Sequence, residues 1–389
     1  MSLNLPRHTW RTVALGEVVE NINEYYRAEE DGTLPYVAGP HIESGQARVA
    51  TYGSTDDGEF PPTFKRMFKP DDVLLHSRGI EKIAVVDRAG VTGEKLFVLR
   101  SKDKSVLSQS FLVWLLRSPA ARSHMEENFT GSVNKFLNWT PLASMPLNLP
   151  PLEEQDRIAR LMWSVDSHSS DTRSMSSSLA SLADKKFFDE LTRSNTSRVP
   201  LPELVDGMTV GVVVKPRQYY TDDPAGVPAL RGLNIQPGRF VLDELVRFRP
   251  ESAKELEKST LRIGDVVVVR TGRPGDAAVV TEEVDGFNCI DLIIVRPGAD
   301  LVPEFLELYL NSSYGRAQAK RLSAGTAQQH FNVGALKQLT IPKLIVDEQR
   351  RLTTEVESIR DSARKVHQEL KALEVLNASL LAEIFGAAT

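Results

Sequence analysis

The sequence predicts an α+β protein built as an internal repeat, with two similar globular domains and two long antiparallel coiled-coil helices related by a pseudo-two-fold axis. Three observations predict this architecture. Residues 347–385 carry an unbroken heptad pattern, residues 153–193 form a second long segment without Pro or Gly, and the two halves of the 389-residue chain match in order. We expect the globular domains at residues 1–150 and 196–343, and the long helices at residues 151–195 and 344–389.

The two domains match at offsets of 193 to 195 residues, and the order of the matches is never broken. Residues 35–45 correspond to 228–238, and residues 69–79 correspond to 262–272. Short runs of residues that favour β-structure predict strands. These runs lie at residues 72–75, 83–86 and 96–99 in the first domain and at 265–269, 277–280 and 290–295 in the second. Helical spacing of apolar residues predicts one shorter helix in each domain, at 108–125 and 303–321.

The first long helix has a regular apolar pattern only at its two ends. Eight serines between residues 164 and 178 replace strong helix formers, so its middle is weak. Both long helices begin alike, with Gln155 and Gln349 lying 194 residues apart. The apolar positions on a roughly helical period are Ile158, Met162, Val165, Leu179, Leu182, Phe187 and Leu191.

The second long helix has apolar residues at alternating spacings of four and three, which is typical of a coiled coil. An exposed apolar stripe is not stable on an isolated helix in water, so the seam predicts a partner, and the first long helix fits that role. Asn377 either controls register within the seam or is hydrated against the serine-rich segment. The seam residues are Leu352, Val356, Ile359, Ala363, Val366, Leu370, Leu373, Asn377, Leu380 and Ile384.

Composition indicates a folded, soluble protein, with 41% apolar and 25% charged residues. Cys289 is the only cysteine, and no apolar run reaches the length of about 18 residues that a membrane helix needs. We therefore expect a cytoplasmic protein without disulfides and without a membrane partner. The net charge of −5 argues weakly against nucleic-acid binding, so any such case must come from local charge.

Motifs for catalysis are missing from the sequence. It contains neither phosphate-binding Gly-rich pattern, GxxxxGK[ST] or GxGxxG, and it contains no HExxH zinc motif. The seven histidines are scattered, and paired acidic residues sit beside Gly or Pro, as expected for solvated turns. We therefore expect a protein that is not an enzyme and that holds no metal or cofactor of its own.

Local charge favours a polyanion as the ligand. Residues 308–346 contain no Asp or Glu but several Lys and Arg, and residues 104–125 and 128–152 of the first domain are also free of acids. Each basic stretch includes a loop of small and polar residues. Asn, Gln, Lys and Arg side chains reach base edges or phosphates, although an ordinary surface role fits each one singly. The loop candidates are Asn134 and Lys135 in the first domain and Gln328, Gln329 and His330 in the second.

Two further groups of residues recur in both domains. Arg78, and Arg270 with Arg273, follow a predicted strand in a Gly-containing loop, a position that suits guanine or phosphate recognition. Two tyrosine pairs lie near cationic residues and could touch the sugar-phosphate backbone, while a core role for one Tyr of each pair is equally plausible. These pairs are Tyr25 with Tyr26 and Tyr219 with Tyr220.

The order of these features resembles the DNA-specificity subunit of type I restriction-modification systems. The residues that carry the resemblance are Leu-Pro-Pro-Leu-Glu-Glu-Gln at 149–155 with Ile158, a second Asp-Glu-Gln helix start at 347–349, and a Gly-Ser/Thr loop before each. The resemblance covers essentially the whole chain. It implies that the two domains are target-recognition domains, each reading one half of a bipartite DNA sequence. Because the two domains differ at nearly all loop positions, we expect an asymmetric target.

The same resemblance implies the partners. Besides double-stranded DNA, the family binds two methyltransferase subunits through the helical spacer, and restriction translocase subunits can join them. S-adenosylmethionine, ATP and Mg²⁺ then belong to those partners, in agreement with the missing motifs. The alternative is a protein-interaction scaffold that joins two ligand-binding domains through an intramolecular coiled coil and has no role in DNA binding.

Overall fold

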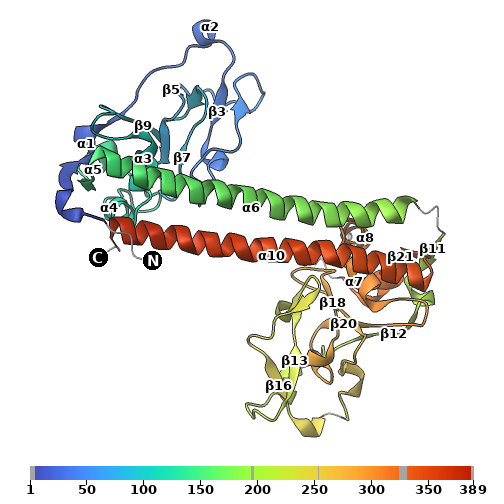
Figure 1. Ribbon diagram of the computed structural model, residues 1–389. Helices are drawn as coiled ribbons and strands as arrows, with labels where there is room; N and C mark the ends of the chain where they lie inside the picture. Colours follow the sequence, from blue (N-terminus) through green and yellow to red (C-terminus); the bar gives the residue numbers. More distant parts are fainter. Residues whose placement is uncertain (1–4, 194–196, 253, 324–330, 387–389) are drawn as a thin grey trace. The chain divides into compact units, whose positions relative to one another are not determined.

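The chain divides into two compact units, each made of one α+β head and a stretch of both long helices. The structure is a computed structural model that describes residues 5–193, 197–252, 254–323 and 331–386 (Figure 1). The long helices are α6 (Leu152–Arg193) and α10 (Val346–Phe385), and we call them the spacer helices. The first unit comprises residues 1–176 and 365–389, and the second comprises residues 177–364.

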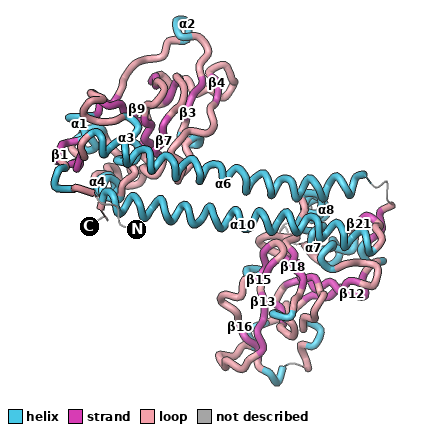
Figure 2. The backbone as a smooth tube through the Cα atoms, in the orientation of Figure 1, coloured by secondary structure: helices cyan, strands magenta, loops and turns pink. Residues whose placement is uncertain are grey.

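The first head contains two four-stranded sheets and a strand pair (Figure 2). The sheet β2-β9-β6-β7 is antiparallel throughout, whereas β4-β3-β8-β5 has one parallel pair, β3 with β8. Apolar side chains of the central strands are buried on both faces, which is why these strands read as continuous apolar runs. The strands are β1 (Arg11–Ala14), β2 (Val19–Asn21), β3 (Pro35–Val37), β4 (Gly53–Ser54), β5 (Arg66–Phe68), β6 (Val73–His76), β7 (Ile83–Val85), β8 (Gly90–Thr92), β9 (Leu96–Ser101) and β10 (Pro146–Leu149).

The second head repeats this topology. Its sheet β12-β20-β17-β18 has the connectivity of β2-β9-β6-β7, β13 pairs in parallel with β19 as β3 does with β8, and β11 pairs with β21 as β1 does with β10. The predicted fold class and internal repeat are therefore confirmed. The strands are β11 (Arg198–Pro200), β12 (Val205–Val210), β13 (Val227–Leu230), β14 (Ile235–Gln236), β15 (Arg239–Phe240), β16 (Val246–Phe248), β17 (Val266–Val269), β18 (Ala277–Val279), β19 (Asn288–Cys289), β20 (Leu292–Pro297) and β21 (Thr340–Pro342).

A single helix was expected after the sheet of each head, but the structure has two. In the first head, α3 (Gln109–Leu116) is followed by α4 (Pro119–Glu127), and in the second, α7 (Pro303–Asn311) is followed by α8 (Ser313–Ser323). Ser118 causes the first break, because its hydroxyl caps α4 by accepting from the Ala121 amide at 3.2 Å and Pro119 then occupies the first turn. Ser312 repeats the arrangement and accepts from the Gly315 amide at 3.1 Å. Short helices α5 (Trp139–Ala143) and α9 (Val333–Lys337) precede the last strand of each head.

A buried glutamine fixes each head to the start of its spacer helix. Gln155 accepts from the Ser108 amide at 2.8 Å, and its side-chain amide donates to the carbonyls of Val106 and Pro150, both at 2.9 Å. Gln349 makes the same three bonds, each at 2.9 Å, with the Val302 amide and with the carbonyls of Asp300 and Leu344. Every partner lies 194 residues from its counterpart. We call each set of three hydrogen bonds a glutamine lock.

The spacer helices pack antiparallel in the first unit. Ile158 and Met162 of α6 share a buried cluster with Ile384 of α10, while His168 further along α6 lies 3.2 Å from Glu369. The numbers rise along one helix as they fall along the other, so the helices run in opposite directions. All ten predicted seam positions of α10 are buried or half-buried, which confirms the heptad pattern.

The serine-rich part of α6 is continuous helix, and two of its buried polar side chains bond to the helix backbone. Ser169 and Thr172 are buried and donate to the carbonyls of Val165 and His168, at 2.9 and 2.7 Å. The prediction that Leu182 lies on the apolar face of α6 is wrong, because its side chain is 50% exposed. The neighbouring Ala183 is buried instead. In the α10 seam, the Asn377 side-chain oxygen is buried without a hydrogen-bond partner among the described residues.

A candidate nucleic-acid interface on each head

Two loops of the first head meet at the end of β6. The Leu137 amide donates to the carbonyl of Ser77 at 2.7 Å, which joins the loop after α4 to the loop that carries Arg78. Thr130 and Phe136 exchange two backbone hydrogen bonds, at 2.9 and 3.0 Å, so residues 131–135 form a closed tip. Gly131 has φ +94°, and a Cβ there would lie 2.9 Å from the Asn134 carbonyl oxygen. The backbone of this tip therefore holds a defined shape.

The exposed side chains of these two loops form a basic, polar surface. Asn134, Lys135 and Arg78 are exposed, so the structure brings these three predicted residues onto neighbouring loops. Among the large apolar side chains of the described residues, Val133 is the most exposed, at 89%. A hollow of about 280 Å³ lies beside the tip and is lined by Ser77, Arg78, Glu94, Lys95, Phe97, Phe136, Leu137, Asn138 and Trp139.

The positive charges of this surface affect the pKa of the neighbouring His76. Burial lowers the pKa of His76, and Lys82, Lys95 and Arg78 lower it further, while Glu81 opposes them. Lys82 also donates to the carbonyl of Gly39 at 2.8 Å. Neither Lys82 nor Lys95 was predicted from the sequence. Lys82 follows β6 in the same connection as Arg78, whereas Lys95 reaches the end of β6 through the hydrogen bond from the Ser77 amide to its carbonyl.

The second head repeats the junction of the two loops. The Phe331 amide donates to the carbonyl of Arg270 at 3.1 Å, in positions that correspond to Leu137 and Ser77. The predicted loop residues Gln328, Gln329 and His330 lie outside the described residues. Arg270 pairs with Asp291, and Arg273 donates to the Ile235 carbonyl at 2.6 Å. Both arginine side chains therefore have partners within their own head.

The predicted tyrosines have partners within their own heads. Tyr26 donates to the Gly32 carbonyl at 2.8 Å, and both Tyr219 and Tyr220 pack on Phe248 with ring centroids 5.9 Å apart. Tyr25 is mostly exposed and forms a backbone bridge to Arg66. Tyr26, Tyr219 and Tyr220 are half-buried, and the ring contacts of Tyr219 and Tyr220 give both a packing role within the second head. Contact of any of the four tyrosines with DNA stays a prediction.

The described part of the chain also lacks the features of two other classes of site. It contains no group of three or more His, Cys, Asp or Glu side chains that could hold a metal ion. Within the same residues, no helix is long and apolar enough to cross a membrane.

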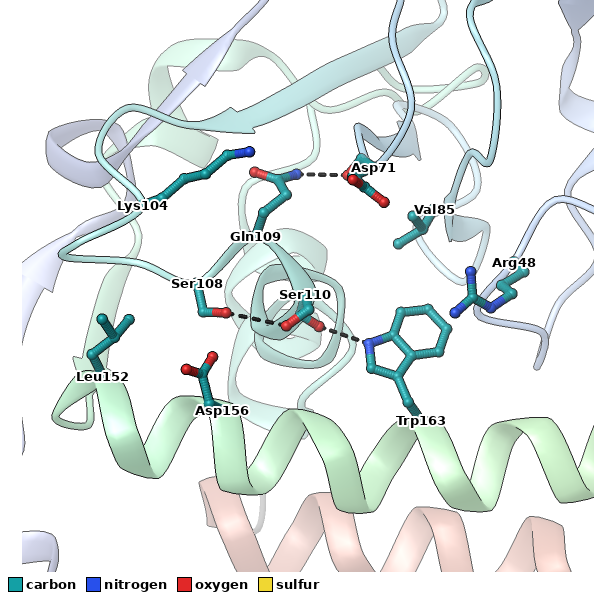
Figure 3. A pocket seen from close by; sticks show the side chains of 10 residues that line it. All are labelled: Arg48, Asp71, Val85, Lys104, Ser108, Gln109, Ser110, Leu152, Asp156 and Trp163. Atoms are coloured by element: carbon teal, nitrogen blue, oxygen red, sulfur yellow. Dashed lines mark hydrogen bonds between the residues drawn. The ribbon is translucent and has the colours of Figure 1, made fainter.

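A second hollow, of about 340 Å³, lies where the first head meets α6 (Figure 3). Trp163 donates from its indole to the Ser110 carbonyl at 2.9 Å, and the Arg48 guanidinium stacks over its ring at 4.1 Å. Figure 3 shows that Asp156 lines this hollow from α6, as Trp163 does, and that Asp71 lines it from the head, as Arg48 does. The lining therefore carries both signs of charge. This hollow belongs to the contact between head and spacer helix.

Comparison with known proteins points to one family. Residues 7–174 match the family model described as "Type I restriction modification DNA specificity domain". The chain is 24% identical over 299 residues to the specificity subunit of the EcoBI type I restriction enzyme of Escherichia coli, a match covering 69% of this chain and 63% of that protein.

Two solved structures share the fold over the full length of both chains. One is the S subunit of a type I restriction-modification system from M. genitalium, with a TM-score of 0.62 and 15% identity. The other comes from work on complex assembly and conformational transition of the type I R-M system, with a TM-score of 0.56 and 19% identity.

Proposed function

We propose that this chain, a member of the type I restriction-modification specificity subunits, reads a bipartite, asymmetric double-stranded DNA target with its two heads. The resemblance predicted from the sequence is confirmed by the family match over residues 7–174. In this proposal the chain is not catalytic. Two methyltransferase subunits and restriction translocase subunits carry the chemistry and bind S-adenosylmethionine, ATP and Mg²⁺.

The observation that carries the proposal is the repeated junction of two loops at the end of β6 and of β17. Each head has the same backbone hydrogen bond there, from Leu137 to Ser77 and from Phe331 to Arg270. The side chains around the two junctions differ, because Arg78 is exposed in the first head whereas Arg270 pairs with Asp291 in the second. Equivalent frames with different side chains are what two readers of different half-targets require.

Docking of protein subunits is supported by apolar side chains on the spacer helices that lie outside the helix-helix seam. Met175, Val375 and Leu376 are exposed in the first unit, and Leu182 and Phe188 are exposed in the second. Exposed apolar residues on a polar helix are suited to burial against another protein. We propose that the methyltransferase subunits cover them.

Reversing the charge at the first junction should weaken DNA binding by the assembled complex. Arg78→Glu and Lys135→Glu are each expected to reduce affinity roughly tenfold or more and to lower the slope of log affinity against log salt by about one. Fluorescence anisotropy with duplex DNA at several salt concentrations measures both quantities. Arg11→Glu, an exposed arginine on β1, is the matched control. Wild-type affinity for both loop variants would favour the alternative, a scaffold without a DNA role.

Val133 gives a test at the level of a single base. Its exposed side chain lies in the same tip as Lys135, and an apolar group in the major groove can contact the methyl group of thymine. We expect deoxyuridine at one thymine of the half-target to weaken binding by the wild-type complex about threefold to tenfold. The complex with Val133→Ser should not distinguish the two bases at that position. Equal sensitivity of both complexes at every thymine would contradict this role.

A further inference from the structure

The contact between the first head and α6 contains a buried acid on the helix and cations on the head. Asp166 of α6 is 8% exposed and accepts from the Ala47 amide at 3.2 Å. Burial raises the pKa of Asp166, and the Ala47 amide, Arg117 and Arg48 of the head, and Arg173 of α6 itself oppose that shift. Arg117 is itself held by a hydrogen bond to the Ile83 carbonyl at 3.4 Å. We call this contact joint 1.

The contact between the second head and α10 contains the opposite arrangement. Glu307 of α7 is buried, and its carboxylate lies 3.8 Å from the guanidinium of Arg360 on α10. Asn311 donates to Glu307 and also exchanges hydrogen bonds with the backbone of Ala277, at 3.0 and 2.9 Å. The acid therefore sits on the head and the cation on the helix. We call this contact joint 2.

The internal repeat places these residues at corresponding positions. At the offset of 194 residues, Asp166 corresponds to Arg360, Arg117 to Asn311, and Val113 to Glu307. Arg117 and Asn311 also take the same structural part, since each donates to a carbonyl of the last strand of its four-stranded sheet, β7 or β18. The two joints thus share one framework. The helix charges, on Asp166 and Arg360, lie at corresponding positions and have opposite signs, whereas the head charges, on Arg117 and Glu307, lie four residues apart in the repeat.

We propose that the opposite charges of the two joints make each head specific for its own spacer helix. The first head fits a helix that carries an acid at the position of Asp166. The second head fits a helix that carries a cation at the corresponding position, that of Arg360. In the exchanged combinations, Arg117 would face Arg360 and Glu307 would face Asp166. A partly buried charge opposite a like charge loses its solvation without gaining a partner, so both exchanged combinations are disfavoured.

The two exchanged combinations are not equally unfavourable. Glu357 of α10 corresponds to Trp163 of α6, on which Arg48 stacks, so Glu357 could pair with Arg48 if the first head packed on α10. No such ion pair would offset the repulsion between Glu307 and Asp166 if the second head packed on α6. If the proposed function holds, this specificity also fixes the order in which the two half-targets are read along the DNA.

The sharpest experiment rewrites joint 2 in the full-length chain without DNA. Arg360→Asp places an acid opposite Glu307, and the triple variant Glu307→Val, Asn311→Arg, Arg360→Asp places the residue types of Val113, Arg117 and Asp166 at the corresponding positions. At pH 8 we expect the single variant to lower the unfolding temperature by about 5 °C and the triple variant to recover at least half of that loss. Arg350→Asp, at an exposed arginine of α10, is the matched control.

The pH dependence separates repulsion from lost packing. Burial raises the pKa of Glu307 to about 7, with Glu357 and Glu304 raising it and Arg360 and Asn311 opposing the shift. In the wild type, Glu307 is therefore mostly ionised at pH 8 and mostly protonated at pH 5.5. Arg360→Asp removes a cation that lowers this pKa and adds an acid, so the pKa of Glu307 rises further in the variant. The loss caused by Arg360→Asp should therefore be largest at pH 8 and shrink at pH 5.5, where Glu307 is protonated in both chains. The proposal is overturned if that loss equals the control, is the same at both pH values, or is not relieved in the triple variant. Because no DNA is present, none of these outcomes bears on the proposed function.

Discussion

Replacing Gln155 by leucine is expected to lower the free energy of unfolding by about 4 kcal/mol, because three buried backbone groups lose their partner at once. Leucine has nearly the same volume, so little of the loss comes from a cavity. The Ser108 amide and the carbonyls of Val106 and Pro150 would be left without the side chain that now satisfies them. Urea-induced unfolding measures the change, and faster hydrogen exchange at the Ser108 amide should locate it at the lock.

Gln349→Leu should reproduce the effect in the second unit, since Gln349 is 2% exposed and makes the same three hydrogen bonds. Gln368→Leu is the matched control, because Gln368 is an exposed residue of α10 and the chemical change is identical. A loss below about 1 kcal/mol at both locks would mean that water replaces the glutamine, and the locks would then not be what fixes the heads to the helices.

The glutamine locks show which features of the fold could be predicted from the sequence and which could not. The spacing of 194 residues between Gln155 and Gln349 identifies the repeat and the two helix starts. The function of the glutamines could not be predicted, because all three partners of each are backbone groups, and any residue type can supply those. Only the folded chain brings the carbonyl of Val106 or Asp300 to the side chain.

Periodicity predicted the spacer helices well because a heptad seam depends on side-chain size and spacing alone. It was wrong where small residues decide the packing. Ala183 rather than Leu182 is buried in α6, in one cluster with Phe187 and Leu352. The breaks at Ser118 and Ser312 had a local signal, a serine that can cap the next helix, but the surrounding helical spacing concealed it.

The candidate interface was predictable only in part. Asn134 and Lys135 stand in a polar, Gly-containing loop of an acid-free stretch, and the structure places them on a loop beside that of Arg78. Lys82 lies four residues after Arg78 in the same connection and could have been found from the sequence. Lys95 carried no comparable signal, because its relation to Arg78 depends on the pairing of β6 with β9. Charge that gathers through tertiary contacts cannot be counted along the sequence.

Two adjacent phenylalanines of α6 provide the second large prediction. Phe187 is 1% exposed and lies against Phe305 and Tyr309 of the second head, with ring centroids 5.9 and 6.5 Å away. Phe187→Ala should therefore lower the free energy of unfolding by about 3–5 kcal/mol, through lost burial and the cavity that remains. Urea-induced unfolding of the full-length chain measures this loss.

Phe188→Ala is the control that the chain itself offers, because Phe188 is the next residue of the same helix and is 44% exposed. Its replacement should change the stability of the isolated chain by less than about 1 kcal/mol. If methyltransferase subunits cover the exposed apolar residues of the spacer helices, the same substitution should instead weaken assembly, which titration of the subunits would detect. The pair therefore separates the two faces of α6: Phe187 acts within the chain, and Phe188 acts only when a partner is present. Equal losses of stability for both variants would contradict this division.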